Sequence, residues 1–180
     1  NLGLPRIPRQ AAAIAAGQGV PRPSDIGKLN GRPFVYVAAF GAFTEVSYDT
    51  PQDLKNTFGH LAYVMAGIAS LPSITPYHLR IECDDQVLED DFFYGMVCNT
   101  GLFEVILVRK PTSITDLTDS LQALIRQEPP QSGAVLSFHA SHLKFTAEKP
   151  IPWTLDGEYG GSHEINVVEN CRQALTVMQG

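Results

Sequence analysis

The sequence lacks several features that would mark common classes of protein. Its longest uncharged apolar run, residues 61–71, is far shorter than the roughly 20 residues that a membrane-spanning helix needs. No basic N-terminal segment precedes an apolar stretch and a cleavage site, so we expect no signal peptide. Lys and Arg total 13 against 19 Asp and Glu, which gives a net charge of -6 and no evident basic face. This balance argues against a nucleic-acid binder and against tight charge-driven binding to anionic lipid.

Cysteine is scarce as well. The chain has three cysteines, Cys83, Cys98 and Cys171, which are odd in number and widely spaced. This pattern is typical of buried thiols in a reducing compartment, not of a disulfide set or a zinc site. We therefore expect a cytoplasmic protein.

The chain also has no loop of the kind that cradles a phosphate. Residues 17–19 read Gly-Gln-Gly but are followed by Pro21 instead of a helix, and Gly160-Gly161 precedes a strand. Neither can place a helix N-terminus under a phosphate. No Ser lies on a strained elbow, so a hydrolase triad is unsupported. The residues alone therefore show no means of holding a nucleotide.

The composition is that of a folded domain. Hydrophobic residues make up 44% and charged residues 18% of 180 residues, enough for one domain or one domain plus part of another. Asn30-Gly31 separates two apolar runs, 25–29 and 34–38, and predicts a hairpin. Further short strands are predicted at 78–83, 86–88, 92–98, 103–108 and over much of 135–177, with a bulge near Ser141-His142.

Helical patterns interrupt these strands. Residues 7–17 predict a short helix, after which Pro21 and Pro23 should break the chain. Apolar residues at helical spacing predict two longer helices, 50–68 and 115–127. We therefore predict an α+β fold: a mostly antiparallel, β-sandwich-like domain with two main helices, and not a doubly wound α/β fold.

Asp156-Gly157-Glu158 is the most informative motif. It places two carboxylates around a glycine at the end of an apolar, strand-like stretch. One carboxylate held in this way can take the proton from a substrate hydroxyl during phosphoryl transfer, while the other supports it. The alternative is an ordinary hairpin turn, because Asp-Gly is a common turn sequence.

Other candidate sites have plainer interpretations. His139 and His142 are three apart, so on one strand they point to opposite faces and a shared metal would need the bulge. The acidic runs 84–85 and 89–91 are expected to be solvated turns in preference to a cation site. Lys55 is expected on the surface, although it can also reach a phosphate or an acidic neighbour.

The apolar helix 54–68 and the join at residues 99–102 leave alternatives open. The helix is expected to lie in the core, or to wall a pocket for an acyl chain. Asn99-Thr100 passes directly to Gly101-Leu102, so either two strands meet in a tight hairpin or a loop of the complete protein is missing there.

Several segments, in order along most of the chain, resemble the diacylglycerol kinase-like lipid kinases, in particular the soluble bacterial diacylglycerol kinases. The matching residues are 25–34, 44–51, Leu54-Lys55, Gly59, Ala62-Tyr63, 79–81, Asn99-Thr100, 101–103, 105–108 and 155–161. The opening residues 1–5 resemble the segment that follows the family's Gly-Gly-Thr nucleotide motif.

The resemblance implies a division into two domains. Residues 1–22 would be the trailing edge of an N-terminal nucleotide-binding domain, and 23–180 the C-terminal β-rich domain, whose last ~10 residues pack back on the first domain. In this family the active site lies in the cleft between the domains. The Asp-Gly-Glu motif supplies the catalytic base, which maps onto Glu158, with Asp156 as its supporting carboxylate. Lys55 and Asn99 are candidates for the substrate or phosphate side.

The sequence departs from the family between Thr100 and Gly101. Relatives carry a longer, glycine-containing loop there that ends in Asp-Asp-Gly and binds a structural magnesium ion. The resemblance implies that the complete protein has this loop. Only the backbone position at Leu102 remains here as a candidate metal ligand.

The resemblance therefore implies a kinase that transfers phosphate from ATP, with Mg²⁺, to diacylglycerol and forms phosphatidic acid. It would be cytoplasmic and would contact the inner face of the membrane. Two alternatives stay open: a non-catalytic lipid-binding or oligomerisation module, and a related kinase for sphingosine, undecaprenol or NAD. The family includes many homodimers, although no residue here indicates one.

Overall fold

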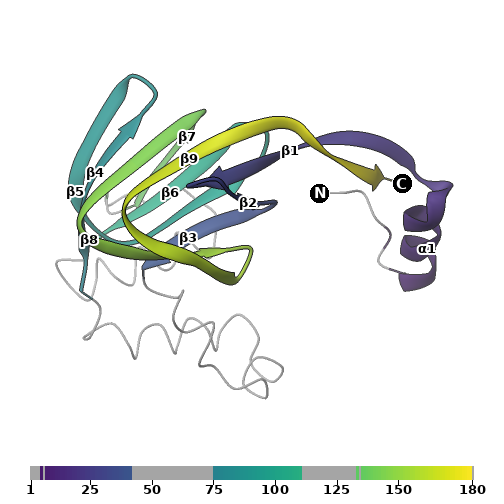
Figure 1. Ribbon diagram of the computed structural model, residues 1–180, viewed down its shortest axis with the longest axis horizontal. Helices are drawn as coiled ribbons and strands as arrows, with labels where there is room; N and C mark the ends of the chain where they lie inside the picture. Colours follow the sequence, from purple (N-terminus) through teal and green to yellow (C-terminus); the bar gives the residue numbers. More distant parts are fainter. Residues whose placement is uncertain (1–4, 6, 42–74, 111–132, 134, 180) are drawn as a thin grey trace, which may run out of the picture.

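The computed structural model describes residues 5, 7–41, 75–110, 133 and 135–179, and this part of the chain is built mainly of β-strands (Figure 1). The expected helices 50–68 and 115–127, and with them Lys55, lie outside the described residues. The elements in chain order are the helix α1 (Pro8–Ala13), the π-helical turn η1 (Ile14–Gln18), and the strands β1 (Val20–Leu29), β2 (Arg32–Phe34), β3 (Val37–Gly41), β4 (Tyr77–Cys83), β5 (Gln86–Asn99), β6 (Phe103–Arg109), β7 (Val135–Ala140), β8 (His142–Leu155) and β9 (Glu158–Gln179).

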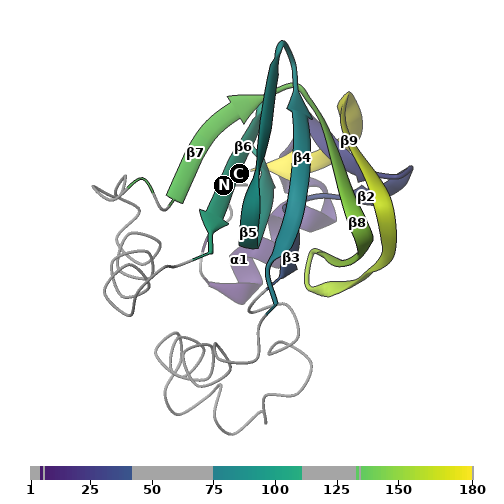
Figure 2. The same ribbon diagram turned by 90° about the vertical axis from the view of Figure 1, so that its left-hand side faces the viewer.

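The strands form one antiparallel sheet. Neighbours follow the order β2-β1-β9-β8-β3-β5-β6-β7, and β4 pairs with both β5 and β8. The sheet is strongly curved, so its inner face surrounds the core (Figure 2). This arrangement confirms the predicted α+β class with a mostly antiparallel sheet.

Strands β3 and β4 share one line of the sheet, because each lies between β5 and β8. Strand β3 ends with Gly41 opposite Tyr94, and β4 begins with Tyr77 opposite Phe92. Residues 42–76 connect the two strands. Strands β3 and β4, which are far apart in sequence, therefore lie end to end and together fill the position between β5 and β8.

The core centres on aromatic side chains from the inner face. The Trp153 ring lies 4.8 Å from that of Phe40 and 5.2 Å from that of Phe145, and all three side chains are fully buried. Each side chain of this size stabilises the fold by about 2–3 kcal/mol on burial. This cluster fixes β3 against β8, the strand that leads into Asp156-Gly157-Glu158.

Several sequence predictions are confirmed. The hairpin at Asn30-Gly31 forms between β1 and β2, with Leu29 opposite Arg32. The short N-terminal helix is present as α1 followed by η1, and Gly17 near its end leaves the helical conformation with a φ of +108°. After Asn99 the given sequence forms a tight hairpin, in which Asn99 pairs with Phe103 across three residues; a longer loop there in the complete protein stays a prediction.

The predicted break at Pro21 and Pro23 is wrong, because β1 runs through both. Val20 to Ser24 pair only with β9, since β2 begins opposite Leu29 and reaches no further than Gly27. A proline on an edge segment can turn its missing N–H away from the ladder, so no hydrogen bond is lost. This part of β1 and the end of β9 extend towards α1 as a two-stranded ribbon (Figure 1).

The acidic run 89–91 was predicted as a solvated turn and is instead part of β5. Strands predicted separately at 86–88 and 92–98 are one continuous strand. Asp84-Asp85, in contrast, is a turn as predicted, with Cys83 opposite Gln86. The alternation of inward-facing residues does shift by one position near Ser141, as predicted. The shift comes from a bend between β7 and β8 and not from a bulge within one strand.

Candidate functional site

The turn Asp156-Gly157 joins β8 to β9, with Leu155 opposite Glu158. Asp156 has a φ of +52° and Gly157 a φ of +92°. Two consecutive positive φ values are the signature of the type I′ turn, in which glycine at the second position avoids strain. The hairpin interpretation of the tripeptide is therefore correct, and it leaves Glu158 as the first residue of β9.

The Asp156 carboxylate is fully engaged by main-chain donors. Its oxygens accept hydrogen bonds from the backbone N–H groups of Val35, at 2.6 Å, Tyr36, at 2.8 Å, and Val37, at 2.9 Å. The Asp156 N–H in turn donates to the Val37 carbonyl at 2.8 Å. Asp156 therefore ties the turn to the segment between β2 and β3. The role of Asp156 in supporting Glu158 stays a prediction. The contact that the geometry does show is the anchoring of the turn by Asp156.

Asn99 holds the same segment from the other side. Its side-chain amide donates to the carbonyls of Val35, at 3.0 Å, and Asp25, at 2.8 Å, and its backbone N–H donates to Tyr36 at 2.9 Å. The Asn99 amide nitrogen is thus committed to protein carbonyls. This places Asn99 next to the candidate site as a positioning residue, while its predicted contact with substrate or phosphate remains untested.

Glu158 itself is exposed at the start of β9. Among the described residues, no hydrogen bond or ion pair involves its carboxylate, so its oxygens are available to a hydroxyl donor. Arg32 lies nearby, since its Nη2 donates to the backbone carbonyl of Tyr159 at 3.2 Å. Sequence reasoning missed Arg32; its position directly after the Asn30-Gly31 turn was the available signal.

The magnesium position at Leu102 stays a prediction. Two buried oxygens close to this hairpin, Asn99 Oδ1 and Asn170 Oδ1, have no hydrogen-bond partner among the described residues. The Leu102 carbonyl already accepts a hydrogen bond from the Thr100 hydroxyl at 2.6 Å, and the Gly101 carbonyl accepts one from Asn170. The nearby Asp25 carboxylate accepts the Gln173 N–H at 2.7 Å. Mg²⁺ needs near-octahedral oxygen ligands. No group of three His, Cys, Asp or Glu side chains that could hold a metal occurs within the described residues, and this includes His139 and His142.

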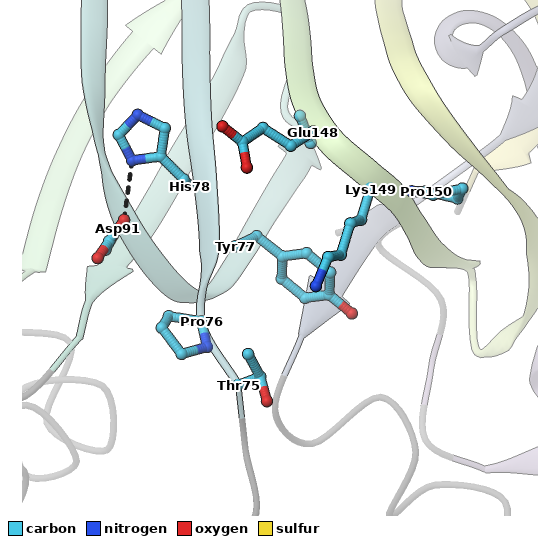
Figure 3. Close-up of a pocket in the computed structure, with 9 residues that line it drawn as sticks. Thr75, Pro76, Tyr77, His78, Asp91, Glu148, Lys149 and Pro150 are labelled. Carbon is cyan, nitrogen blue, oxygen red and sulfur yellow. Dashed lines mark hydrogen bonds and ion pairs between the residues drawn. The ribbon is translucent and has the colours of Figure 1, made fainter.

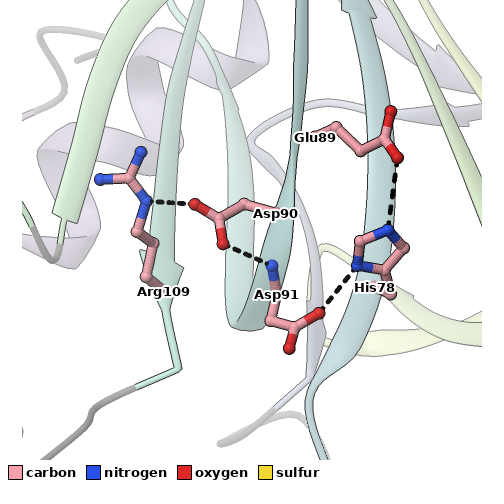
Figure 4. A network of polar contacts seen from close by, with 5 residues as sticks. All are labelled: His78, Glu89, Asp90, Asp91 and Arg109. Carbon is pink, nitrogen blue, oxygen red and sulfur yellow. Dashed lines mark hydrogen bonds and ion pairs between the residues drawn. The ribbon is translucent and has the colours of Figure 1, made fainter.

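A second polar cluster lies on β4, β5 and β6 (Figure 4). His78 contacts Asp91 at 2.8 Å and Glu89 at 3.5 Å, and Arg109 contacts Asp90 at 2.7 Å. The hydrogen bond that His78 donates to the Asp91 carboxylate, followed by its bond to Glu89, raises the pKa of His78 above its ordinary value. These ion pairs explain how the acidic run 89–91 is accommodated within a strand.

A shallow cavity of about 450 Å³ lies beside this cluster, at the start of β4 (Figure 3). Its lining comes from residues 75–78, Asp91 and residues 147–150. The carboxylates there are Asp91 and Glu148, and the cations are His78 and Lys149. Because both signs of charge are present and Asp91 is already paired with His78, the lining favours no particular ligand class.

Comparison with known proteins gives a consistent result. No protein-family model matches the chain. The chain is 31% identical over 177 residues to a diacylglycerol kinase of Bacillus subtilis, which covers 89% of this chain and 58% of that protein. A diacylglycerol kinase of Staphylococcus carnosus is 32% identical over 170 residues, covering 85% of this chain and 55% of that protein. The chain is a relative of the bacterial diacylglycerol kinases.

Solved structures agree on the fold. A diacylglycerol kinase structure from Bacillus anthracis superposes with a TM-score of 0.68 at 16% identity, covering 99% of this chain and 61% of that one. A further structure from the same organism gives a TM-score of 0.75 at 18% identity and covers 64% of that chain. The strand-rich fold matches the C-terminal domain of these kinase structures. The chain spans little more than half the length of the curated relatives it matches.

Proposed function

We propose that this chain supplies the acceptor side of a lipid kinase active site, in which Glu158 takes the proton from the hydroxyl of diacylglycerol. The observation that carries the proposal is the exposed Glu158 carboxylate directly after a turn that Asp156 fixes through three main-chain hydrogen bonds. A base held in this way can meet an incoming hydroxyl without first leaving another partner. The homology to diacylglycerol kinases supports the choice of reaction.

The proposed reaction is a direct phosphoryl transfer. The acceptor oxygen bonds to the γ-phosphorus of ATP, the bond from that phosphorus to ADP breaks, and the hydroxyl proton passes to Glu158. Because the transition state is loose, positioning and charge neutralisation dominate, and the base acts late. Magnesium would accompany the nucleotide phosphates and neutralise their charge, but the described residues provide no ligand set for it.

The proposal includes the organisation expected from the resemblance. Residues 1–22 would belong with a nucleotide-binding domain that holds ATP, and residues 23–180 would form the acceptor-side domain. No described helix is long and apolar enough to cross a membrane. Access to diacylglycerol would then come through contact with the inner membrane surface.

The test is a kinase assay of the complete protein with ATP, Mg²⁺ and a panel of hydroxyl acceptors: diacylglycerol, sphingosine, undecaprenol and NAD. Glu158→Gln should keep the fold and lower turnover by about 10²- to 10⁴-fold, the usual contribution of a general base. Glu164→Gln, an exposed glutamate further along β9, is the matched control and should keep full turnover. Near-normal turnover of Glu158→Gln would remove Glu158 from the base role. Faster turnover with another acceptor would mean that this molecule, and not diacylglycerol, is the substrate.

A further inference from the structure

The short segment Val35–Val37 is locked through its main chain. All three of its N–H groups donate to the Asp156 carboxylate. The carbonyls of Val35 and Tyr36 accept hydrogen bonds from Asn99, and that of Val37 accepts one from the Asp156 N–H. All six main-chain N–H and C=O groups of residues 35–37 are therefore paired, and this holds the backbone in one conformation. On the Asp156 side, these bonds take the place of a neighbouring strand.

The side chains on this rigid segment nevertheless remain in solvent. Tyr36 is 70% exposed and Val35 is 52% exposed. Tyr159, the residue after Glu158, is 57% exposed, and its carbonyl accepts a hydrogen bond from Arg32, the first residue of β2. We call Val35, Tyr36 and Tyr159 the apolar rim. Large apolar side chains grouped beside a candidate site are typical of a binding surface.

The chemistry of the rim selects among partners. A peptide that adds as a strand needs free main-chain donors and acceptors, and residues 35–37 have none left. None of the three rim residues carries a charge. The exposed cation beside them, Arg32, already donates to the Tyr159 carbonyl, so any anionic group would lie at Arg32 and not on the rim itself. A neutral, apolar ligand fits, and tyrosine suits it well because its ring is apolar and its hydroxyl meets the polar end of a lipid.

Position restricts the ligand further. A hydroxyl within hydrogen-bonding reach of Glu158 puts the rest of its molecule over the residues around the same turn. Those residues include the rim, because Val35 and Tyr36 bond to Asp156 and Tyr159 follows Glu158 in the chain. A rigid surface also binds at a lower entropic cost than a mobile one.

We propose that the acyl-chain part of the acceptor lipid packs on Val35, Tyr36 and Tyr159, so that the apolar rim determines the preference for long-chain acceptors. This inference rests on the proposed function of Glu158 and adds to it the residues that recognise the hydrocarbon. The rim acts on binding of the acceptor and takes no part in proton transfer.

The test uses the complete protein and the double variant Val35→Ser/Tyr36→Ser, because the main-chain hydrogen bonds of this segment do not need either side chain. KM and kcat are measured for dioleoylglycerol in mixed micelles and for a short-chain, water-soluble diacylglycerol. The KM for dioleoylglycerol should rise about tenfold or more, as for loss of apolar contacts in a substrate pocket. The KM for the short-chain lipid should change much less, and kcat should hold for both. Val87→Ser, an equally exposed valine on β5, is the control and should change neither.

Equal loss for both acceptors, together with a lower melting temperature, would overturn the proposal and show that another part of the protein covers the rim. Unchanged kinetics would also overturn it. Binding of the two lipids to catalytically inactive Glu158→Gln, with and without the double substitution, gives a readout that needs no turnover. Selective loss of long-chain binding in the double variant would support lipid binding by the rim. If wild-type protein bound the lipids in this way but phosphorylated neither, only the proposed function would fail.

Discussion

Two hairpin turns in this sheet each contain an aspartate whose carboxylate binds a distant segment of the chain, but the two aspartates position different parts of the molecule. Asp84 lies between β4 and β5, and Asp156 lies between β8 and β9; both have a left-handed backbone, with φ values of +46° and +52°. Each carboxylate accepts main-chain N–H groups from a distant segment. Asp84 binds the N–H groups of Ser141, at 3.1 Å, and His142, at 3.2 Å, as well as the Ser141 hydroxyl at 2.6 Å.

The two turns differ in what each carboxylate positions. Asp84 fixes the bend at Ser141, where the chain passes from β7 to β8, and no candidate catalytic residue lies beside it. Asp156 fixes the segment Val35–Val37 beside an exposed carboxylate, Glu158. The aspartate is therefore a structural anchor in both turns. The proposed chemistry at the second turn therefore belongs to Glu158.

The largest expected effect comes from removing the anchor at the candidate site. Asp156→Ala leaves three N–H groups without their charged acceptor, and hydrogen bonds to charged groups contribute about 1.5–3 kcal/mol each when buried. Because water can replace part of this interaction here, we expect a stability loss of about 2 kcal/mol. Turnover of the complete protein should fall about 10²-fold, since displacement of Glu158 by about 1 Å is enough for that. Denaturant unfolding and steady-state kinetics measure the two effects.

Asp156→Asn provides the control for this variant. The amide oxygen can still accept hydrogen bonds from the segment, so stability and turnover should both lie between those of wild type and of Asp156→Ala. Full turnover in a destabilised Asp156→Ala protein would show that the anchor does not position Glu158, and the contrast between the two turns would disappear.

A smaller and purely structural effect is expected at the other turn. Asp84→Ala should lower the free energy of unfolding by about 1 kcal/mol, because its partners at Ser141 and His142 lie near solvent. Turnover of the folded complete protein should stay unchanged. Asp85→Ala, at the adjacent position, removes no hydrogen bond or ion pair among the described residues and should alter neither quantity. A loss of turnover in Asp84→Ala that matches Asp156→Ala would mean that both turns serve the site.

Much of the fold could be predicted because its signals are local. Asn30-Gly31 and Asp156-Gly157 are short turn sequences with a known backbone geometry. The alternation of inward residues along β8 and the change of parity at Ser141 can be read directly from the sequence. These signals sufficed for the antiparallel α+β class and for placing Glu158 immediately after a turn.

The remaining features depend on partners that are distant in the sequence. The bonds from Val35–Val37 to Asp156 join residues about 120 positions apart, and no local pattern announces them. The acidic run 89–91 reads as a turn until its partners His78, Arg80 and Arg109 are placed on neighbouring strands. Pro21 and Pro23 read as a break because nothing in their neighbourhood shows that β1 has a free edge there.

The smallest expected effect is a pH dependence of stability at the anchor of the first turn, Asp84. The Ser141 hydroxyl, followed by the backbone N–H groups of Ser141 and His142, holds the pKa of Asp84 below its ordinary value of 3.8. A carboxylate with a lowered folded-state pKa stabilises the protein above its unfolded-state pKa, and this contribution is lost as the pH falls through the folded-state pKa. The contribution of Asp84 should therefore be constant near neutral pH and decline only below about pH 4.

The measurement is the difference in unfolding free energy between wild type and Asp84→Asn, taken by denaturant titration from pH 7 down to pH 3. Asparagine does not titrate in this range, so the difference should shrink at the acid end by less than about 1 kcal/mol, because solvent screens an exposed carboxylate. Ser141→Ala removes the strongest cause of the lowered pKa, so in that background the difference should begin to shrink at a higher pH. A difference that stays constant down to pH 3 in both backgrounds would mean that Asp84 anchors the bend by geometry alone, without its charge.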